Sequence, residues 1–563
     1  MTPTRAAALA AVAALSLSAP AAGSPSQESI IQDDPKIVFA KPAALERTLA
    51  ELRALGADRI RVSVFWDSLA PKPQSKTKPA FRGSGAADPR SYDADRWDRY
   101  DRIAASARRH GLAVIFNVTG PAPLWATGRP ERKDLEESYD VRPSDFGEFV
   151  AAVGRRYSGS YEDERPPPPP PKDDGPIDLP GPLAGEDEES PPEPPAGIVP
   201  RVDTWSMWNE PNVPGWLTPQ WVPDPRGGRR QLHSSPRIFR NLNDAGWASL
   251  QATGHAGDTF LLAETGPRGR GKQGIARGMR PLEFVRELYC LNRRSKPYRG
   301  EDARLRGCPR TKAERAAFPN KHPGLFRASG WAHHPYALET TPSATDRVKD
   351  NVVMSGLSRL TRTLDRALRG YGVKRRLPLW ITEYGYQTNP PDPTIGISWK
   401  RQAAFLNEAD FIGYRNKRVA SVAQYQLFDD APRHGYSPGD PGYWGTFQSG
   451  LVTFEGRKKS AYATYQRTIH VSPARPRSGA KLRVFGQLRA GPRVPALEVR
   501  LEFARKGGAY KTVASKVTRN PRRFALLSAK AKSSGSYRLV WTQPATGKPL
   551  PTRAVKVSVR RRR

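Results

Sequence analysis

The feature that most constrains the fold is an alternation of helix-like and strand-like patterns between about residues 36 and 468. The first clear helical stripe ends at Gly56, and an apolar run follows it at once. With a weaker first strand expected within 29–40, the segment holds eight strand–helix units. Near-continuous apolar strands are typical of a parallel sheet covered on both faces. The later strands are predicted at LAVIFNV, VDTWSMW, TFLLAET, ASGWAHH, PLWITEY and VASVAQYQLF.

Eight such units predict an α/β fold, a (β/α)8 TIM barrel over 36–468. One insertion, at 165–197, is rich in proline and acidic residues and is expected to be an exposed, extended or disordered loop. Beyond residue 470 the helical periodicity ends. Short alternating runs separated by Gly, Pro and Ser predict an added all-β sandwich, Ig-like, over 470–563 with an arginine-rich tail.

The N-terminus has the pattern of an export signal. Residues 1–21 combine a short basic start, an Ala/Leu/Val run and a small-residue cleavage site, as in a cleaved signal peptide. An N-terminal segment, 22–35, would then precede the barrel. The alternative is a lipid-anchored or uncleaved N-terminal helix. No other stretch is a candidate for a transmembrane segment, so the protein is expected to be secreted, with association to the cell surface as a further option.

The two cysteines, Cys290 and Cys308, lie in one predicted loop region. In an exported protein a disulfide between them is favoured over two free thiols. The eight histidines form no HExxH motif and no Cys/His spacing of a zinc site. No metal and no cofactor are therefore expected.

The formal net charge of +36 is concentrated near the C-terminus. Between residues 470 and 563 there are 24 Lys and Arg but only two acidic residues, Glu498 and Glu502, which gives +22. Such a segment is suited to an anionic cell-surface polymer; a solvated arginine-rich surface is the alternative. No helix-turn-helix, zinc finger or RNA-binding motif accompanies the charge, so nucleic acid is not an expected partner.

Two glutamates follow apolar strands of the predicted barrel. Glu210 lies in WSMWNEPN after the fourth strand, and Glu383 lies in WITEYGYQT at the end of the seventh. In such barrels the chemistry takes place at the C-terminal ends of the strands. Cleavage of a glycosidic bond needs two carboxyl groups, about 5–5.5 Å apart in the retaining mechanism. Two ordinary solvated carboxylates are the alternative.

The pair WNEPN and ITEYG resembles clan A of the glycoside hydrolases, particularly families 39 and 5, over roughly 36–468. The resemblance implies that Glu210 is the general acid/base and Glu383 the nucleophile. It also implies that Asn209 bonds the sugar 2-hydroxyl, while a turn residue at the strand end is the simpler role. The substrate would be an oligo- or polysaccharide.

Three further residues match the clan's pattern. Arg61 lies within an apolar strand, where an unpaired guanidinium would be costly, and the resemblance places it against the nucleophile; Arg59, or an outward orientation, is the alternative. The sequence HHPY matches a His-x-Tyr pattern at His334 and Tyr336. By resemblance Tyr336 hydrogen-bonds the nucleophile and His334 holds the network or the sugar. His333 is the alternative in register, and a structural core histidine is the simpler role.

Aromatic residues near strand ends could stack on sugar rings, and Trp216 and Trp444 are the favoured candidates. The sequence also departs from the clan in two places. The third strand ends in NVTGP without the histidine common in family 5, and the eighth reads QYQLFDD where a tryptophan is frequent. These departures leave the sugar specificity open. Glu264, ending the fifth strand, is a third carboxylate and is expected to add a substrate contact.

The sequence thus predicts a secreted retaining glycoside hydrolase that cleaves O-glycosidic bonds, β-linked by resemblance, through double displacement. The alternative from another class is a non-catalytic carbohydrate- or cell-wall-binding protein on a barrel scaffold. A transglycosidase would use the same residues.

Overall fold

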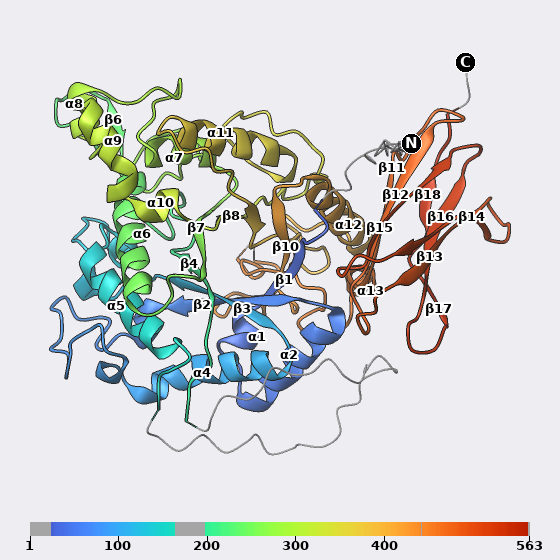
Figure 1. Cartoon of the computed structure of the whole chain (residues 1–563), viewed down its shortest axis with the longest axis horizontal. Helices are drawn as coiled ribbons and strands as arrows, with labels where there is room; N and C mark the ends of the chain where they lie inside the picture. Colours follow the sequence, from blue (N-terminus) through green and yellow to red (C-terminus); the bar gives the residue numbers. More distant parts are fainter. Residues whose placement is uncertain (1–23, 164–196, 441, 561–563) are drawn as a thin grey trace, which may run out of the picture.

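The computed structural model describes residues 24–163, 197–440 and 442–560. Eight parallel strands close into a barrel in the order β1-β10-β9-β8-β7-β4-β3-β2 (Figure 1), which confirms the predicted fold class. The strands are β1 (Glu28–Gln32), β2 (Arg59–Phe65), β3 (Ala113–Thr119), β4 (Thr204–Met207), β7 (Thr259–Thr265), β8 (Gly330–His333), β9 (Leu379–Ile381) and β10 (Val419–Tyr425).

Helices cover the outside of the barrel with their apolar faces. The helix α2 (Pro42–Leu55) is capped by Gly56, whose φ of 86° lies in the left-handed region that glycine adopts readily. A Cβ there would also lie 2.1 Å from the Arg489 carbonyl oxygen. The longer helices are α2 (Pro42–Leu55), α4 (Ala94–Arg109), α5 (Pro143–Arg156), α6 (Ser235–Ala252), α7 (Pro281–Leu288), α9 (Lys312–Lys321), α11 (Leu357–Arg369), α12 (Trp399–Arg415) and α13 (Ser460–Gln466).

Short elements lie in the connections between the barrel strands. A two-stranded antiparallel hairpin, β5 and β6, follows β4. The short elements are α1 (Asp34–Ile37), α3 (Trp66–Leu69), α8 (Gly300–Arg304), α10 (Pro323–Phe326), β5 (Trp221–Pro223) and β6 (Gln231–His233).

The barrel begins earlier than predicted. The strand β1 pairs with β10 and β2, so the barrel includes residues that were predicted to belong to an N-terminal segment, before the expected boundary at 36. Two buried polar side chains in this strand, Ser29 and Gln32, interrupt its apolar pattern. They are buried because they accept hydrogen bonds from Arg489 and Arg61, respectively. The predicted signal, 1–21, lies outside the described residues, and so does the Pro-rich insertion apart from Gly197.

The C-terminal part forms two antiparallel sheets, as predicted. Side chains from both sheets, including Val484 and Leu539, pack into one apolar core. The first sheet has the order β11-β12-β15; in the second, β14-β13-β16-β17 are neighbours and β18 also pairs with β16. The strands are β11 (Arg467–Ser472), β12 (Lys481–Leu488), β13 (Leu497–Ala504), β14 (Lys511–Thr518), β15 (Phe524–Lys530), β16 (Gly535–Thr542), β17 (Pro549–Pro551) and β18 (Val555–Val557).

The sandwich packs beside α12 and α13 of the barrel (Figure 1). At this interface Arg489 is buried and donates to Ser29 Oγ at 2.8 Å, Asp410 Oδ1 at 2.8 Å and Thr468 Oγ1 at 2.8 Å. Asp58, at the N-terminal end of β2, pairs with Arg493 and Arg522. Part of the basic excess of the C-terminal domain is therefore used to dock it on the barrel.

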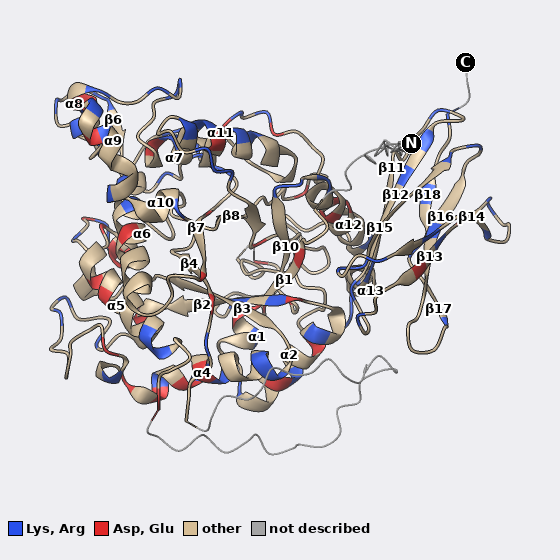
Figure 2. Cartoon of the chain, in the orientation of Figure 1, with Lys and Arg blue, Asp and Glu red and all other residues tan. Residues whose placement is uncertain are grey.

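The charged residues are unevenly distributed over the fold. Figure 2 shows Lys and Arg along α11 and on the strands of the sandwich, where acidic residues are few. Within the described ranges, no helix has both the length and the apolar character needed to cross a membrane.

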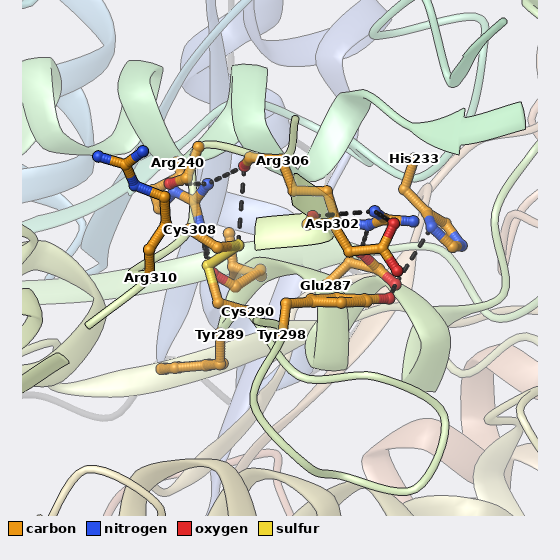
Figure 3. Close-up of a disulfide and its surroundings, with 12 residues drawn as sticks. His233, Arg240, Glu287, Tyr289, Cys290, Tyr298, Asp302, Arg306, Cys308 and Arg310 are labelled. Atoms are coloured by element: carbon orange, nitrogen blue, oxygen red, sulfur yellow. Dashed lines mark hydrogen bonds and ion pairs between the residues drawn. A yellow bond between two sulfur atoms is a disulfide. The ribbon is translucent and has the colours of Figure 1, made fainter. Parts of the chain in front are cut away.

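Cys290 and Cys308 form the predicted disulfide (Figure 3). Beside it, the buried Arg240 of α6 donates to the carbonyl oxygens of Leu288 at 3.0 Å and Arg306 at 2.9 Å, and to Cys290 Sγ at 2.9 Å. Burial lowers the pKa of Arg240 to about 10. This arginine therefore ties both ends of the disulfide loop to the barrel's helical layer.

Replacing Arg489 with alanine is expected to lower the free energy of unfolding by about 3–5 kcal/mol, because Asp410 would remain buried without its cation. Thermal and urea unfolding measure this loss. Arg505→Ala, at an exposed position of the same domain, is the matched control and should change stability by no more than about 0.5 kcal/mol. Equal stability of the two variants would contradict the role given to Arg489.

Candidate active site

The two predicted catalytic glutamates converge at one end of the barrel. Glu210 follows β4 and Glu383 follows β9, both at the C-terminal ends of parallel strands. One oxygen of each carboxylate and one ring nitrogen of His334 all lie within 4.8 Å of one another. The side chains of Glu210 and Glu383 are 16% and 11% exposed. The pair is thus largely enclosed and still reachable from solvent.

The turn that carries Glu210 has an unusual backbone. Trp208 and Glu210 have φ angles of 61° and 36°, in a region that costs a non-glycine residue about 1–3 kcal/mol. Hydrogen bonds hold the turn, because Asn209 N donates to Thr119 Oγ1 at 2.9 Å and Glu210 N donates to the Glu264 carbonyl at 3.1 Å. The neighbouring strands therefore fix the direction of the acid/base candidate.

Arg61 on β2 is fully buried and lies against the nucleophile candidate. It donates to Glu383 Oε1 at 3.0 Å, to Glu264 Oε1 at 3.2 Å and to Asn209 Oδ1 at 2.8 Å. The alternative, Arg59, pairs instead with Glu28. Because the amide oxygen of Asn209 is engaged by Arg61, its amide nitrogen is left as the donor for a ligand.

The two members of the His-x-Tyr pattern both reach the carboxylates. His334 contacts Glu210 Oε1 through Nδ1 at 2.9 Å, and Tyr336 donates its hydroxyl to Glu383 Oε2 at 3.0 Å. His333, the alternative in register, contacts Thr265 and the Val352 carbonyl instead. Burial lowers the pKa of His333 to about 3, so this histidine is a neutral core residue.

The environment of His334 makes it a cation. Burial alone would lower its pKa, but the charge of Glu383 and hydrogen bonds to Glu210 and Glu264 raise the pKa to about 10. Its Nε2 contacts Glu264 Oε2 at 2.8 Å, so both ring nitrogens face carboxylates and both carry hydrogens. The side chains of Glu210, His334 and Glu383 thus form an ion-pair network.

Glu383 sits between opposing influences. Burial raises the pKa of its carboxyl above the ordinary value, while the positive charges of His334 and Arg61 act in the other direction. Two hydrogen bonds, from Arg61 and Tyr336, orient one oxygen each. The carboxylate is therefore held in place from both sides.

The role expected for Glu264 was wrong. Its side chain is completely buried, so it cannot be a substrate contact. It accepts hydrogen bonds from Arg61, from Ser206 Oγ at 2.6 Å, from His334 and from Thr382. Burial would raise the pKa of this carboxyl, but the charges of Arg61 and His334 hold it well below its usual range. The signal in the sequence was a glutamate within an apolar strand, which needs buried partners.

The described contacts of the two predicted tryptophans involve other residues than the glutamates. The Trp216 carbonyl accepts from Trp208 Nε1 at 2.9 Å, and the Trp444 ring lies 5.1 Å from that of Tyr443. No described contact links either ring to Glu210 or Glu383, so their stacking on sugar stays a prediction.

Another aromatic side chain is linked to the site through a chain of ring contacts. Phe447, which is 50% exposed, lies 5.4 Å from Tyr425 between ring centroids, and Tyr425 lies 6.4 Å from Tyr336. Sequence reasoning missed Phe447 because it belongs to a long loop without periodicity.

Comparisons with known proteins give structural matches alone. No family model matches the sequence, and no curated protein does. A glucosidase from Croceicoccus marinus is 11% identical, with 90% of this chain and 94% of that chain covered and a TM-score of 0.43. A GH5_18 protein from Streptomyces cattleya, solved in complex with Manb1-4GlcNAc, is 14% identical, with 78% of each chain covered and a TM-score of 0.41. These likenesses concern the fold alone.

Glu264→Gln tests the source of the charge on His334. Because the folded-state pKa of about 10 exceeds that of a free imidazole, protonated His334 stabilises the fold fully below about pH 6.5, and this contribution is lost as the pH rises toward 10. The substitution should lower the pKa of His334 and move that loss to lower pH. Urea unfolding over this pH range measures it. Glu131→Gln, exposed and outside the network, should keep the wild-type profile, and the same profile in Glu264→Gln would refute the assignment.

Proposed function

We propose that the chain is a retaining glycoside hydrolase that cleaves oligo- or polysaccharides by double displacement. One observation carries the proposal: oxygens of Glu210 and Glu383 approach to within 4.8 Å. Retaining enzymes place their two carboxyl groups about 5–5.5 Å apart, whereas inverting enzymes separate them by about 6.5–9.5 Å to admit a water molecule. The spacing supports retention.

In the first step Glu383 attacks the anomeric carbon and forms a glycosyl ester. Glu210 gives its proton to the departing glycosidic oxygen as the carbon–oxygen bond breaks. Arg61 and Tyr336 hold the two oxygens of Glu383, so the attacking carboxylate loses little freedom on reaction. His334 donates to Glu210 Oε1 and fixes its direction.

In the second step Glu210 takes a proton from water, the water oxygen attacks the anomeric carbon, and Glu383 is released as a carboxylate. Formation of the ester removes the negative charge of Glu383, so the carboxylate that takes the proton from water no longer faces that charge.

Two features favour catalysis over the alternative, a carbohydrate-binding protein. They are the strained backbone turn at Glu210 and the buried charges of Arg61, Glu264 and His334. A site that only binds neutral sugar needs neither a strained turn nor buried charges. The β-linkage is proposed from the resemblance of the motifs, and export is proposed from the pattern of residues 1–21.

Glu383→Gln is expected to abolish turnover of aryl β-glycosides, and Glu210→Gln to slow it by about 10²–10⁴-fold for poor leaving groups. Azide should restore activity to Glu383→Gly with an inverted glycosyl azide as product, and to Glu210→Gly with a retained one. Product stereochemistry by NMR separates the two roles. Unchanged activity in both glutamine variants would sink the catalytic proposal, whereas full activity of Glu131→Gln is the expected control.

We also propose that the sandwich binds an anionic polymer. Lys481 and Lys530 lie directly opposite each other on β12 and β15, and Arg483 is the next residue on the same face; all three are exposed. Like charges directly opposite on a sheet are destabilising, and a bound anion would relieve that repulsion. The two acidic residues of the domain lie on the other sheet, paired with arginines.

Replacing Lys481, Arg483 and Lys530 together by glutamine should weaken retention on an immobilised acidic polysaccharide and reduce its salt dependence, because exposed charges are screened by salt. Affinity electrophoresis over a salt series measures both. The matched control changes Lys506, Lys511 and Lys516, exposed residues of the other sheet or the loop before it, to glutamine. Equal loss in both triple variants would point to net charge alone.

A further inference from the structure

We propose that the loop 266–280 binds a negative charge on the leaving-group side of the substrate, so that the preferred substrate is an acidic glycan. This inference rests on the proposed function and names its substrate class. The loop, GPRGRGKQGIARGMR, follows β7 directly and contains five Lys and Arg residues and no acidic residue.

Both ends of this loop are fastened beside the acid/base candidate. Asn212, two residues after Glu210, donates to the carbonyl oxygens of Gly266 at 3.2 Å and Met279 at 2.9 Å. Gly266 N donates back to Asn212 Oδ1 at 2.8 Å. A Cβ on Gly266 would lie 3.0 Å from Glu210 Oε1, so the loop starts in contact with that carboxyl group.

Further bonds fix the course of the loop. Arg268 donates to the carbonyl of Tyr336 at 3.1 Å. Tyr336 is the residue whose hydroxyl donates to Glu383. The Ile275 carbonyl accepts from Gln220 N at 2.9 Å, and the Arg277 carbonyl accepts from Trp221 Nε1 at 3.1 Å. The loop is therefore attached to the segment that follows Glu210.

Among the described residues, four of the five cations of this loop lack a carboxylate partner, whereas Arg268 pairs with Asp346 at 3.1 Å. Arg270, Lys272 and Arg277 are exposed, and among the described residues no carboxylate pairs with them or with Arg280. The Nε of Arg280 is buried without a hydrogen-bond acceptor, which is costly for a polar group. On the neighbouring hairpin connection the arginines are neutralised, as Arg226 and Arg230 pair with Asp224 and Asp302.

The position of the loop decides which part of the substrate it meets. The acid/base gives its proton to the departing oxygen, so the leaving group lies on the Glu210 side of the scissile bond. A loop that begins against Glu210 faces that leaving group. Unpaired cations on a fastened loop attract an anion and raise its local concentration, and the arginine guanidinium matches a carboxylate or sulfate in geometry.

The test compares two aryl β-glycosides of the same sugar, one with a 4-carboxyphenyl and one with a 4-(methoxycarbonyl)phenyl leaving group. The ester withdraws electrons more strongly, so intrinsic reactivity favours it. We expect the wild-type kcat/KM to be about tenfold higher for the acid than for the ester. Salt should suppress this preference. A 4-sulfophenyl glycoside distinguishes a general anion site from one that requires a carboxylate.

The variant Arg270→Gln/Lys272→Gln/Arg277→Gln should lose about tenfold in kcat/KM on the acid and keep its rate on the ester. The matched control removes the same charge from exposed positions of α11, with Arg362, Arg366 and Arg369 changed to glutamine, and should retain the preference. Equal wild-type rates on acid and ester, or an equal loss on both in the loop variant, would overturn the inference.

If the wild-type protein hydrolyses neither glycoside over a series of different sugars, the proposed function is contradicted. The loop is then tested by binding alone. Calorimetric titration with the same two glycosides then decides. Tighter binding of the acid that disappears in the loop variant supports the anion site, and equal binding of acid and ester overturns it.

Discussion

The buried guanidinium of Arg61 is the group on which the site depends. It joins Glu264, Asn209 and Glu383, from three other barrel strands or the turns that follow them. A buried charge without partners is strongly destabilising, so the sequence can retain Arg61 only if these acceptors converge on it. The contacts that bury Arg61 within the barrel therefore also orient Glu383, the nucleophile candidate.

Charge balance gives this network its chemistry. Three carboxylates face two permanent or near-permanent cations, Arg61 and His334, which leaves one negative charge in excess. Glu264 is the carboxyl held most firmly in the ionised state, and burial raises the pKa of Glu383. Of the three, the Glu210 side chain is the most exposed to solvent.

The sequence predicted the barrel because apolar parallel strands have a local pattern, and it placed both glutamates at strand ends. It placed β1 only loosely, within 29–40, because the buried Ser29 and Gln32 of this strand interrupt its apolar pattern and bond to Arg489 and Arg61. The prediction for Glu264 was also wrong, because a glutamate in an apolar strand indicates that buried partners exist but not which residues they are. The partners of Glu264 are Arg61 and His334, which are 203 and 70 residues away in the sequence. The predicted tryptophans lie in loops whose paths no local periodicity determines.

A large net charge is by itself weak evidence for a ligand, and this chain shows why. Some arginines of the sandwich, such as Arg489 and Arg522, are used against acidic groups of the barrel. Arg226, next to the site, is likewise neutralised. Only cations that the fold leaves without carboxylates remain available to an external anion. The unpaired cations of the loop 266–280 lie on a segment that begins beside the acid/base candidate. The position of these unpaired charges, rather than the total charge of the chain, is therefore what supports an acidic substrate.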